Sequence, residues 1–149
     1  MSFIGARRFD LAQRTIASME QRAWGLHTNA MMTRDVGLPL AHALISFGME
    51  QYAEAVNILQ PLRTIANRFG GSNAQRDVIH LTLTEAALRS GNAKLARALA
   101  SERTQLKPTS PFNWQLTARA LQLHGDKAGA AKARETVGAR RRAQFSFAQ

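Results

Sequence analysis

The sequence predicts an all-α protein in which antiparallel helix hairpins stack as a solenoid, with about seven helices in total. Three observations support this prediction. Ala, Leu, Arg and Gln dominate the chain, and all four occur readily in helices. Similar stretches recur along the sequence, as expected of a repeat protein. Each clear copy also places a turn signal between two apolar segments, which is typical of a helix hairpin.

The clearest repeat lies in the C-terminal half of the chain. Residues 113–130, NWQLTARALQLHGDKAGA, align with residues 79–96, IHLTLTEAALRSGNAKLA, at a shift of 34 residues. This shift is the period of tetratricopeptide repeats, which are helix–turn–helix units. Gly125 aligns with Gly91, and glycine suits the left-handed residue that ends a helix. We therefore assign both segments to tetratricopeptide-like hairpins.

Two looser copies lie earlier in the chain. Residues 47–62, FGMEQYAEAVNILQPL, align with residues 4–19 so that Gly48 matches Gly5. The copy at 4–19 begins at its turn, which makes it half a repeat. The prediction is a single domain of residues 1–149, with a half repeat at 4–24 and whole repeats at about 36–69, 73–108 and 111–143.

Apolar spacing and end signals then define the helices in order. They are predicted at about residues 6–22, 37–48, 51–69, 73–89, 92–106, 111–124 and 126–143. Residues 25–36, GLHTNAMMTRDV, are predicted to form a loop, with a helical turn as the alternative. The aligned residues Ala55, Ala96 and Ala130 are predicted to be buried where paired helices cross. Trp114 occupies the large aromatic position of its repeat and is predicted to pack in the core.

The stretch GGSNAQRDV, residues 70–78, is the one segment that resembles a phosphate-binding loop. A Walker-type loop needs Lys and Ser or Thr after its last glycine, whereas Asn73 and Ala74 follow here. The glycines instead suit the end of one helix, and Ser72 suits the N-cap of the next. The alternative is a weak anion site at the helix N-terminus, contacted by Ser72 and Arg76.

Three stretches together resemble the tetratricopeptide repeat protein 38 family and its bacterial relatives. They are GGSNAQRDV, ARALASERTQLKPTSP (96–111) and GLPLAHALISFGMEQYAEAV (37–56). The resemblance covers residues 4–124 and corresponds to the C-terminal part of those longer proteins. It implies a helical-repeat fold, and it brings no assigned catalytic residues.

The residue content offers no recognisable catalytic, metal or cofactor site. The chain has no cysteine, and its four histidines form neither an HExxH motif nor an i, i+4 pair. The glutamates lie in different repeats, each near Arg or Lys, as expected of solvated or paired side chains. We therefore expect a protein that is not an enzyme and that needs neither a cofactor nor a metal.

The charge is strongly basic, with 20 Lys and Arg against 10 Asp and Glu. Such a balance favours acidic partners, including nucleic acid. Nucleic-acid binding through Arg140, Arg141 and Arg142 is the alternative function, and a solvated helix end is the simpler interpretation of those arginines. We expect neither a secretory signal nor a membrane span, and hence a cytoplasmic protein.

The first helix of each repeat lines the inner face of a tetratricopeptide solenoid. Helical spacing therefore predicts one ligand-facing row over two such helices, formed by Thr82, Glu85, Arg89, Gln115, Arg119 and Gln122. The leading functional hypothesis is a non-enzymatic module that binds a protein or peptide on this face. A severed regulatory part of a longer repeat protein is a further alternative.

The half repeat raises a separate expectation. The predicted helix at 6–22 has the apolar residues Phe9, Ile16 and Met19 but no first helix of its own repeat to cover them. An exposed apolar strip commonly marks an interface. We expect this helix to pack against a second copy of the chain, forming a homodimer, or against the 25–36 segment.

Overall fold

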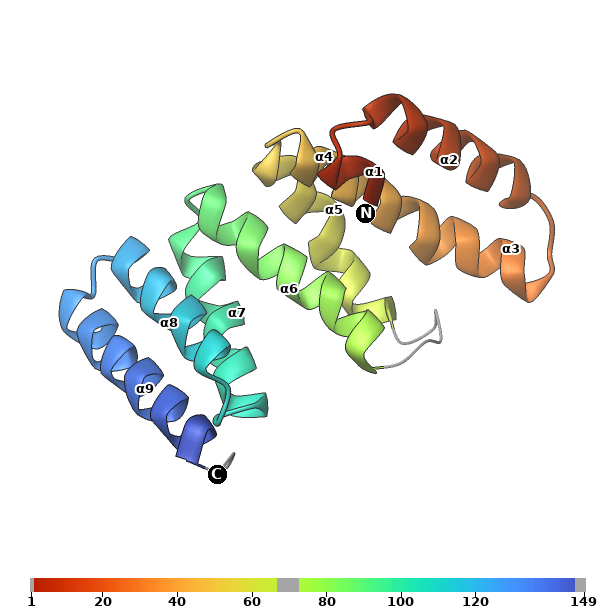
Figure 1. The fold of residues 1–149 in the computed structure, drawn as a ribbon. Helices are drawn as coiled ribbons and strands as arrows, with labels where there is room; N and C mark the ends of the chain where they lie inside the picture. The colour runs from red at the N-terminus through yellow and green to blue at the C-terminus, as the bar shows by residue number, and fades with distance from the viewer. Residues whose placement is uncertain (1, 67–72, 147–149) are drawn as a thin grey trace. The chain divides into compact units, whose positions relative to one another are not determined.

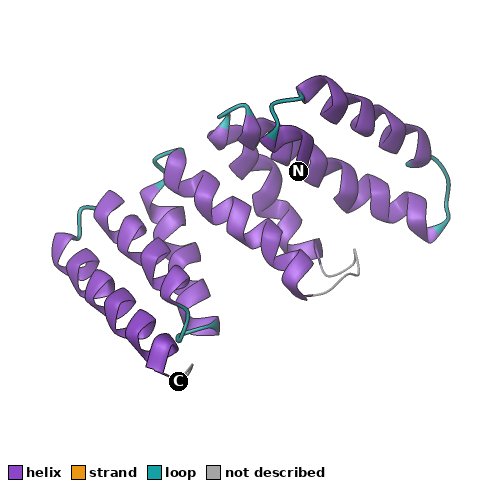
Figure 2. Ribbon diagram, viewed as in Figure 1, coloured by secondary structure: helices purple, strands orange, loops and turns teal. Residues whose placement is uncertain are grey.

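The computed structural model describes residues 2–66 and 73–146, with side chains placed in 2–66 and 76–143. Within these ranges the chain consists of helices, turns and short connections, with no strand (Figure 2). The all-α prediction is therefore confirmed for the described part of the chain. Ser72 and the two glycines before it lie outside the described residues, so the helix-capping prediction for this segment stays a prediction.

Within each unit, helices joined by short turns form antiparallel hairpins, such as α4 with α5 and α8 with α9 (Figure 1). Their bounds are α1 (Ser2–Gly5), α2 (Phe9–Arg22), α3 (Thr28–Met32), the π-helical turn η1 (Thr33–Gly37), α4 (Leu38–Gly48), α5 (Tyr52–Ile65), α6 (Asn73–Arg89), α7 (Ala93–Leu106), α8 (Pro111–Leu123) and α9 (Lys127–Ser146). From α4 onward, the predicted helix starts agree with the observed ones to within one residue.

The segment at 25–36 is the main departure from the predicted helices. It is helical from Thr28 onward, and α3, η1 and α4 follow without a break. Ala30 and Val36 are buried, so this segment contributes to the core rather than crossing the surface as a polar loop. The widened turn η1 comes just before Pro39, whose nitrogen has no hydrogen to donate.

The chain divides into two compact units, residues 1–86 (unit 1) and 87–149 (unit 2), with the boundary inside α6. In unit 1, α2 packs against η1 and α4 (Figure 1). Ala12 and Ile16 of α2 form a small core with Ile45 of α4. The N-terminal helix was expected to pack against a second copy of the chain or against the 25–36 segment. The structure shows α2 packed against this segment, which is helical from Thr28 rather than a loop.

In unit 2, α8 packs against both α7 and α9. Leu99 of α7 and Leu116 of α8 are among the largest fully buried side chains. Trp114, predicted to be a core residue, is half-buried, and its indole Nε1 donates a hydrogen bond of 2.8 Å to the Pro108 carbonyl.

One backbone turn recurs four times within the described residues. Its left-handed residues are Arg7 (φ 55°), Glu50 (φ 63°), Gly91 (φ 76°) and Gly125 (φ 88°). In each copy the next residue donates its N–H to the carbonyl five residues back, over 2.8 to 3.0 Å. This is the bond that closes a Schellman helix end, and it lets the second helix of each hairpin start at once.

Each left-handed residue lies five positions before an alanine, namely Ala12, Ala55, Ala96 and Ala130. The last three have an exposed fraction of 0%. The predicted burial of these alanines is therefore confirmed. The repeat register holds in the structure even where the spacing between copies departs from 34 residues.

The first two copies form their left-handed turn without a glycine. Gly5 and Gly48 are the ends of α1 and α4, and the left-handed residues follow two positions later. A Cβ at Gly48 would collide with Ile4, so this glycine allows α1 to approach α4 closely.

A buried polar cluster fixes the connection from α7 to α8. Arg103 and Asn113 have exposed fractions of 7% and 2%. Arg103 Nε donates to Asn113 Oδ1 over 3.3 Å, and Asn113 Nδ2 donates to the Arg103 carbonyl over 2.9 Å and to the Lys107 carbonyl over 3.4 Å. Ser110 caps α8 by accepting the Asn113 N–H. These bonds satisfy polar groups that burial would otherwise penalise.

Candidate binding surfaces

The predicted ligand-facing row falls on α6 and α8. On α6, Thr82 is 9% exposed and leaves little surface for a ligand, whereas Glu85 is half-buried and Arg89 is exposed. On α8, Gln115, Arg119 and Gln122 are all exposed and lie on one face of the helix. The part of the row that the structure brings together as a surface is therefore the α8 part.

Two large apolar side chains extend this α8 face at its ends. Phe112 is 49% exposed and Leu123 is 40% exposed, and helical spacing places both beside Arg119. Gln122 is held in place, because its Oε1 accepts a hydrogen bond of 3.2 Å from Arg134 Nη2 of α9. We call the surface formed by Phe112, Gln115, Arg119, Gln122 and Leu123 the α8 face.

The basic charge of the chain is concentrated in unit 2. Residues 87–149 contain 12 Lys and Arg and 3 Asp and Glu, a net charge of +9, whereas residues 1–86 contain 8 and 7, a net charge of +1. Arg140, Arg141 and Arg142 are exposed near the end of α9. A shallow groove of about 470 Å³ runs along α9, lined by Lys132, Glu135, Thr136, Ala139, Arg140 and Arg142.

A second shallow groove, of about 600 Å³, runs along α2 in unit 1. We call it the α2 groove, and its lining residues are Phe3, Leu11, Arg14, Thr15, Ser18, Met19 and Arg22. An apolar pocket of about 90 Å³ adjoins it and shares Phe3 and Thr15 with it.

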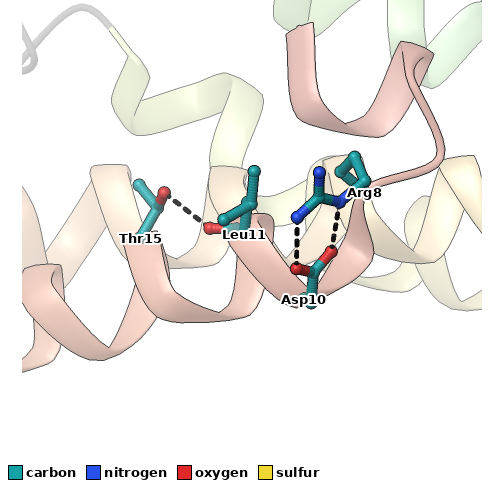
Figure 3. A network of polar contacts seen from close by, with 4 residues as sticks. All are labelled: Arg8, Asp10, Leu11 and Thr15. Carbon is teal, nitrogen blue, oxygen red and sulfur yellow. Dashed lines mark hydrogen bonds and ion pairs between the residues drawn. The ribbon is translucent and has the colours of Figure 1, made fainter.

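A bidentate ion pair lies at the N-terminal end of α2 (Figure 3). Arg8 Nε and Nη2 donate to the two carboxylate oxygens of Asp10 over 2.9 and 2.8 Å. This hydrogen-bonded pairing lowers the pKa of the Asp10 carboxyl and raises that of Arg8. One turn further on, Thr15 Oγ1 donates to the Leu11 carbonyl over 2.9 Å.

The remaining candidates give no further site. Arg76 is half-buried on α6, while Ser72 is outside the described residues, so the anion site remains a prediction. Over the part of the chain with placed side chains, no three His, Asp or Glu residues are close enough to hold a metal ion. None of the described helices combines the length and the apolar character needed to cross a membrane.

Comparison with known proteins assigns neither a family nor a known fold to this chain. No protein-family model matches the sequence, and no solved structure matches the fold.

The Arg103–Asn113 pair and the exposed apolar residues at the ends of the α8 face were not predicted from the sequence. A signal for the pair was present in the repeat register. Asn113 aligns with Ile79, and Arg103 aligns with Leu62, so two polar residues replace apolar ones at equivalent positions. Two such replacements next to one helix connection indicate that the residues pair with each other.

Proposed function

We propose that this chain is a non-enzymatic interaction module of the tetratricopeptide repeat type, which binds a protein or peptide segment on the α8 face. The repeated left-handed turn, with a buried alanine five residues later, supports the repeat assignment. The resemblance to the tetratricopeptide repeat protein 38 family favours the same class.

The single observation that carries the binding proposal is the composition of the α8 face. Phe112 and Leu123 are 11 residues apart, which corresponds to about 16 Å along a helix. Arg119 lies between them and is exposed. An extended peptide of about five residues covers this length. The matching ligand has two apolar side chains with an acidic residue between them.

Selection from a displayed random-peptide library tests this proposal. We expect the selected peptides to carry Asp or Glu between apolar residues. Arg119→Glu should weaken their binding at least about tenfold, because it replaces attraction with like-charge repulsion. Phe112→Ala should weaken it through the loss of an apolar anchor.

Arg97→Glu is the matched control, because Arg97 is exposed on α7 of the same unit and the charge change is identical. Selected peptides that bind wild type and Arg119→Glu equally would contradict the assignment to the α8 face.

Nucleic-acid binding by unit 2 is the second candidate function. The observation that favours it is the net charge of +9 in residues 87–149, together with the exposed Arg140, Arg141 and Arg142. Binding through phosphate contacts weakens steeply with salt, because it releases counterions from the nucleic acid.

Titration of a labelled single-stranded oligonucleotide at several salt concentrations separates the two candidates. If nucleic acid is the ligand, a triple Arg140, Arg141 and Arg142 to Gln variant should reduce the slope of log affinity against log salt by about two. An unchanged slope would remove this helix from the candidate interface.

A further inference from the structure

In two of the hairpins, the second helix packs along the helix that precedes it. In unit 1, α5 packs against α4, and in unit 2, α9 packs against α8. The helix α2 follows the same left-handed turn, and the four-residue α1 lies before it. Ala12 and Ile16 of α2 are buried, whereas the α2 groove on the same helix is open.

The repeat register aligns one residue of the α2 groove, Met19, with a buried residue of α5, Leu62. Met19 lies seven residues after Ala12, and Leu62 lies seven residues after Ala55. Leu62 is buried in the hairpin of α4 and α5, whereas Met19 is half-buried. An apolar side chain thus occupies an equivalent position in both helices, and in α2 it lines a groove instead of a core.

The groove has room for an anchoring side chain. The adjoining 90 Å³ pocket is lined mainly by apolar residues, including Ile16 of α2 and Leu44 and Ile45 of α4. A helix lying along α2 can place an aliphatic side chain there while its neighbours contact Leu11 and Met19. Such anchors in pockets dominate the energetics of helix-in-groove binding.

The charged residues that line the α2 groove indicate the charge of the helix that fits it. Arg14 and Arg22 are its only charged lining residues. Both are exposed, and neither forms a hydrogen bond or an ion pair with another residue in the described ranges. They are eight residues apart, or about 12 Å along the helix. Two copies meeting face to face would bring four guanidinium groups together without a carboxylate in either lining, which disfavours a second copy as the occupant.

We propose that the α2 groove docks an amphipathic helix of a partner protein, one that carries acidic residues about two turns apart beside its apolar face. This surface belongs to unit 1, so the proposal is independent of the function proposed for the α8 face.

Two designed peptides test the proposal on the whole chain. Both are helical with a leucine stripe at i, i+3 and i+4 spacing, and they differ only in having Glu or Lys on the flanks of the stripe. We expect fluorescence anisotropy to show that the Glu peptide binds at least about tenfold more tightly than the Lys peptide. Met19→Asp should weaken binding of the Glu peptide at least about tenfold, because it places a carboxylate in the groove.

Two further variants keep a folding defect from being mistaken for the expected result. Ala17→Asp places the same carboxylate on α2 but outside the groove, and it should leave binding unchanged. The double variant Arg14→Glu and Arg22→Glu should reverse the preference toward the Lys peptide, which an unfolded helix cannot do.

Three results would overturn the proposal. They are equal binding of the two peptides, no binding of either, and a wild-type dimer in sedimentation that Met19→Asp dissociates. The last result would assign the groove to a second copy of the chain. A failure here leaves the Arg119→Glu test of the α8 face unaffected, because the two sets of variants lie in different units.

Discussion

Units 1 and 2 build the same hairpin from different residues. At the left-handed turn position, unit 1 has Arg7 and Glu50, whereas unit 2 has Gly91 and Gly125. A side chain at such a position costs roughly 1–2 kcal/mol, and glycine avoids most of that cost. The hydrogen bond that closes the turn is nevertheless 2.8 Å long in both turns of unit 1 and 3.0 Å long in both turns of unit 2. The packing of the two helices, rather than the local preference of one residue, therefore determines the turn.

The cores of the two units also differ in the residues that occupy equivalent positions. Unit 1 has Leu62 and Ile79 at positions where unit 2 has Arg103 and Asn113. All four side chains are buried. Unit 2 keeps the helix arrangement because its two polar replacements satisfy each other across the α7–α8 connection. The difference shows that the core of a hairpin accommodates two polar residues in place of two apolar ones when the polar residues hydrogen-bond to each other.

The largest predicted effect breaks this pairing. Asn113→Ala should lower the free energy of unfolding by about 3 kcal/mol, because it removes three buried hydrogen bonds, one from Arg103 Nε and two to backbone carbonyls, and opens a cavity. Urea unfolding followed by tryptophan fluorescence measures it. The double variant Arg103→Leu and Asn113→Ile, which copies unit 1, should cost less than the sum of the two single changes. Additive costs would show that the two residues are not coupled.

The next effect tests the feature that both units share. Ala55→Leu and Ala96→Leu should each lower the free energy of unfolding by about 1–3 kcal/mol, since both alanines are fully buried and neither site has room for a larger side chain. Circular dichroism during urea unfolding measures the change. Ala53→Leu and Ala98→Leu, at exposed positions of the same helices, should stay within about 0.5 kcal/mol of wild type. Equal effects at buried and exposed positions would contradict the shared register.

Exchanging turn residues between the units should give effects of opposite sign. Gly125→Ala should destabilise unit 2 by about 1–2 kcal/mol, because alanine is strained at φ 88°. Glu50→Gly should relieve strain in unit 1, and its gain should stay below about 1 kcal/mol because glycine also increases the entropy of the unfolded chain. Thermal unfolding of both variants measures the signs, and a loss of stability in Glu50→Gly would show that Glu50 makes contacts that outweigh its strain.

These comparisons explain what the sequence could and could not predict. Helices from α4 onward and the buried alanines follow from apolar spacing, because a repeated core requires the same small residue at each crossing. The turns at Arg7 and Glu50 could not be found by looking for glycine, since packing imposes their conformation. In the segment at 28–36, Ala30 and Val36 are buried and η1 packs against α2 and α4, tertiary contacts that the sequence of the segment does not reveal.

The binding surfaces were predicted less completely than the fold. Helical spacing placed Gln115, Arg119 and Gln122 on one face of a helix, and in the structure all three are exposed on α8. Their role as ligand contacts stays a prediction. Spacing alone could not tell that Thr82, at a comparable place on α6, is buried. Exposure depends on which neighbouring elements cover a face, and that information is absent from a single helix.

The smallest predicted effect concerns the ion pair that begins α2 in unit 1. Arg8 lowers the pKa of Asp10, so this carboxylate contributes stability above its unfolded pKa of about 3.9 and loses the contribution as the pH falls through the folded value. Arg8→Gln should return the Asp10 pKa toward its ordinary value, as measured by NMR titration of the carboxyl carbon. Both side chains are exposed, so the urea midpoint at neutral pH should not move measurably. Arg34→Gln, which removes the pair with Asp35, is the matched control and should leave the Asp10 titration unchanged. If Asp10 titrates identically in wild type and Arg8→Gln, the bidentate pair does not persist in solution, and α2 begins without it.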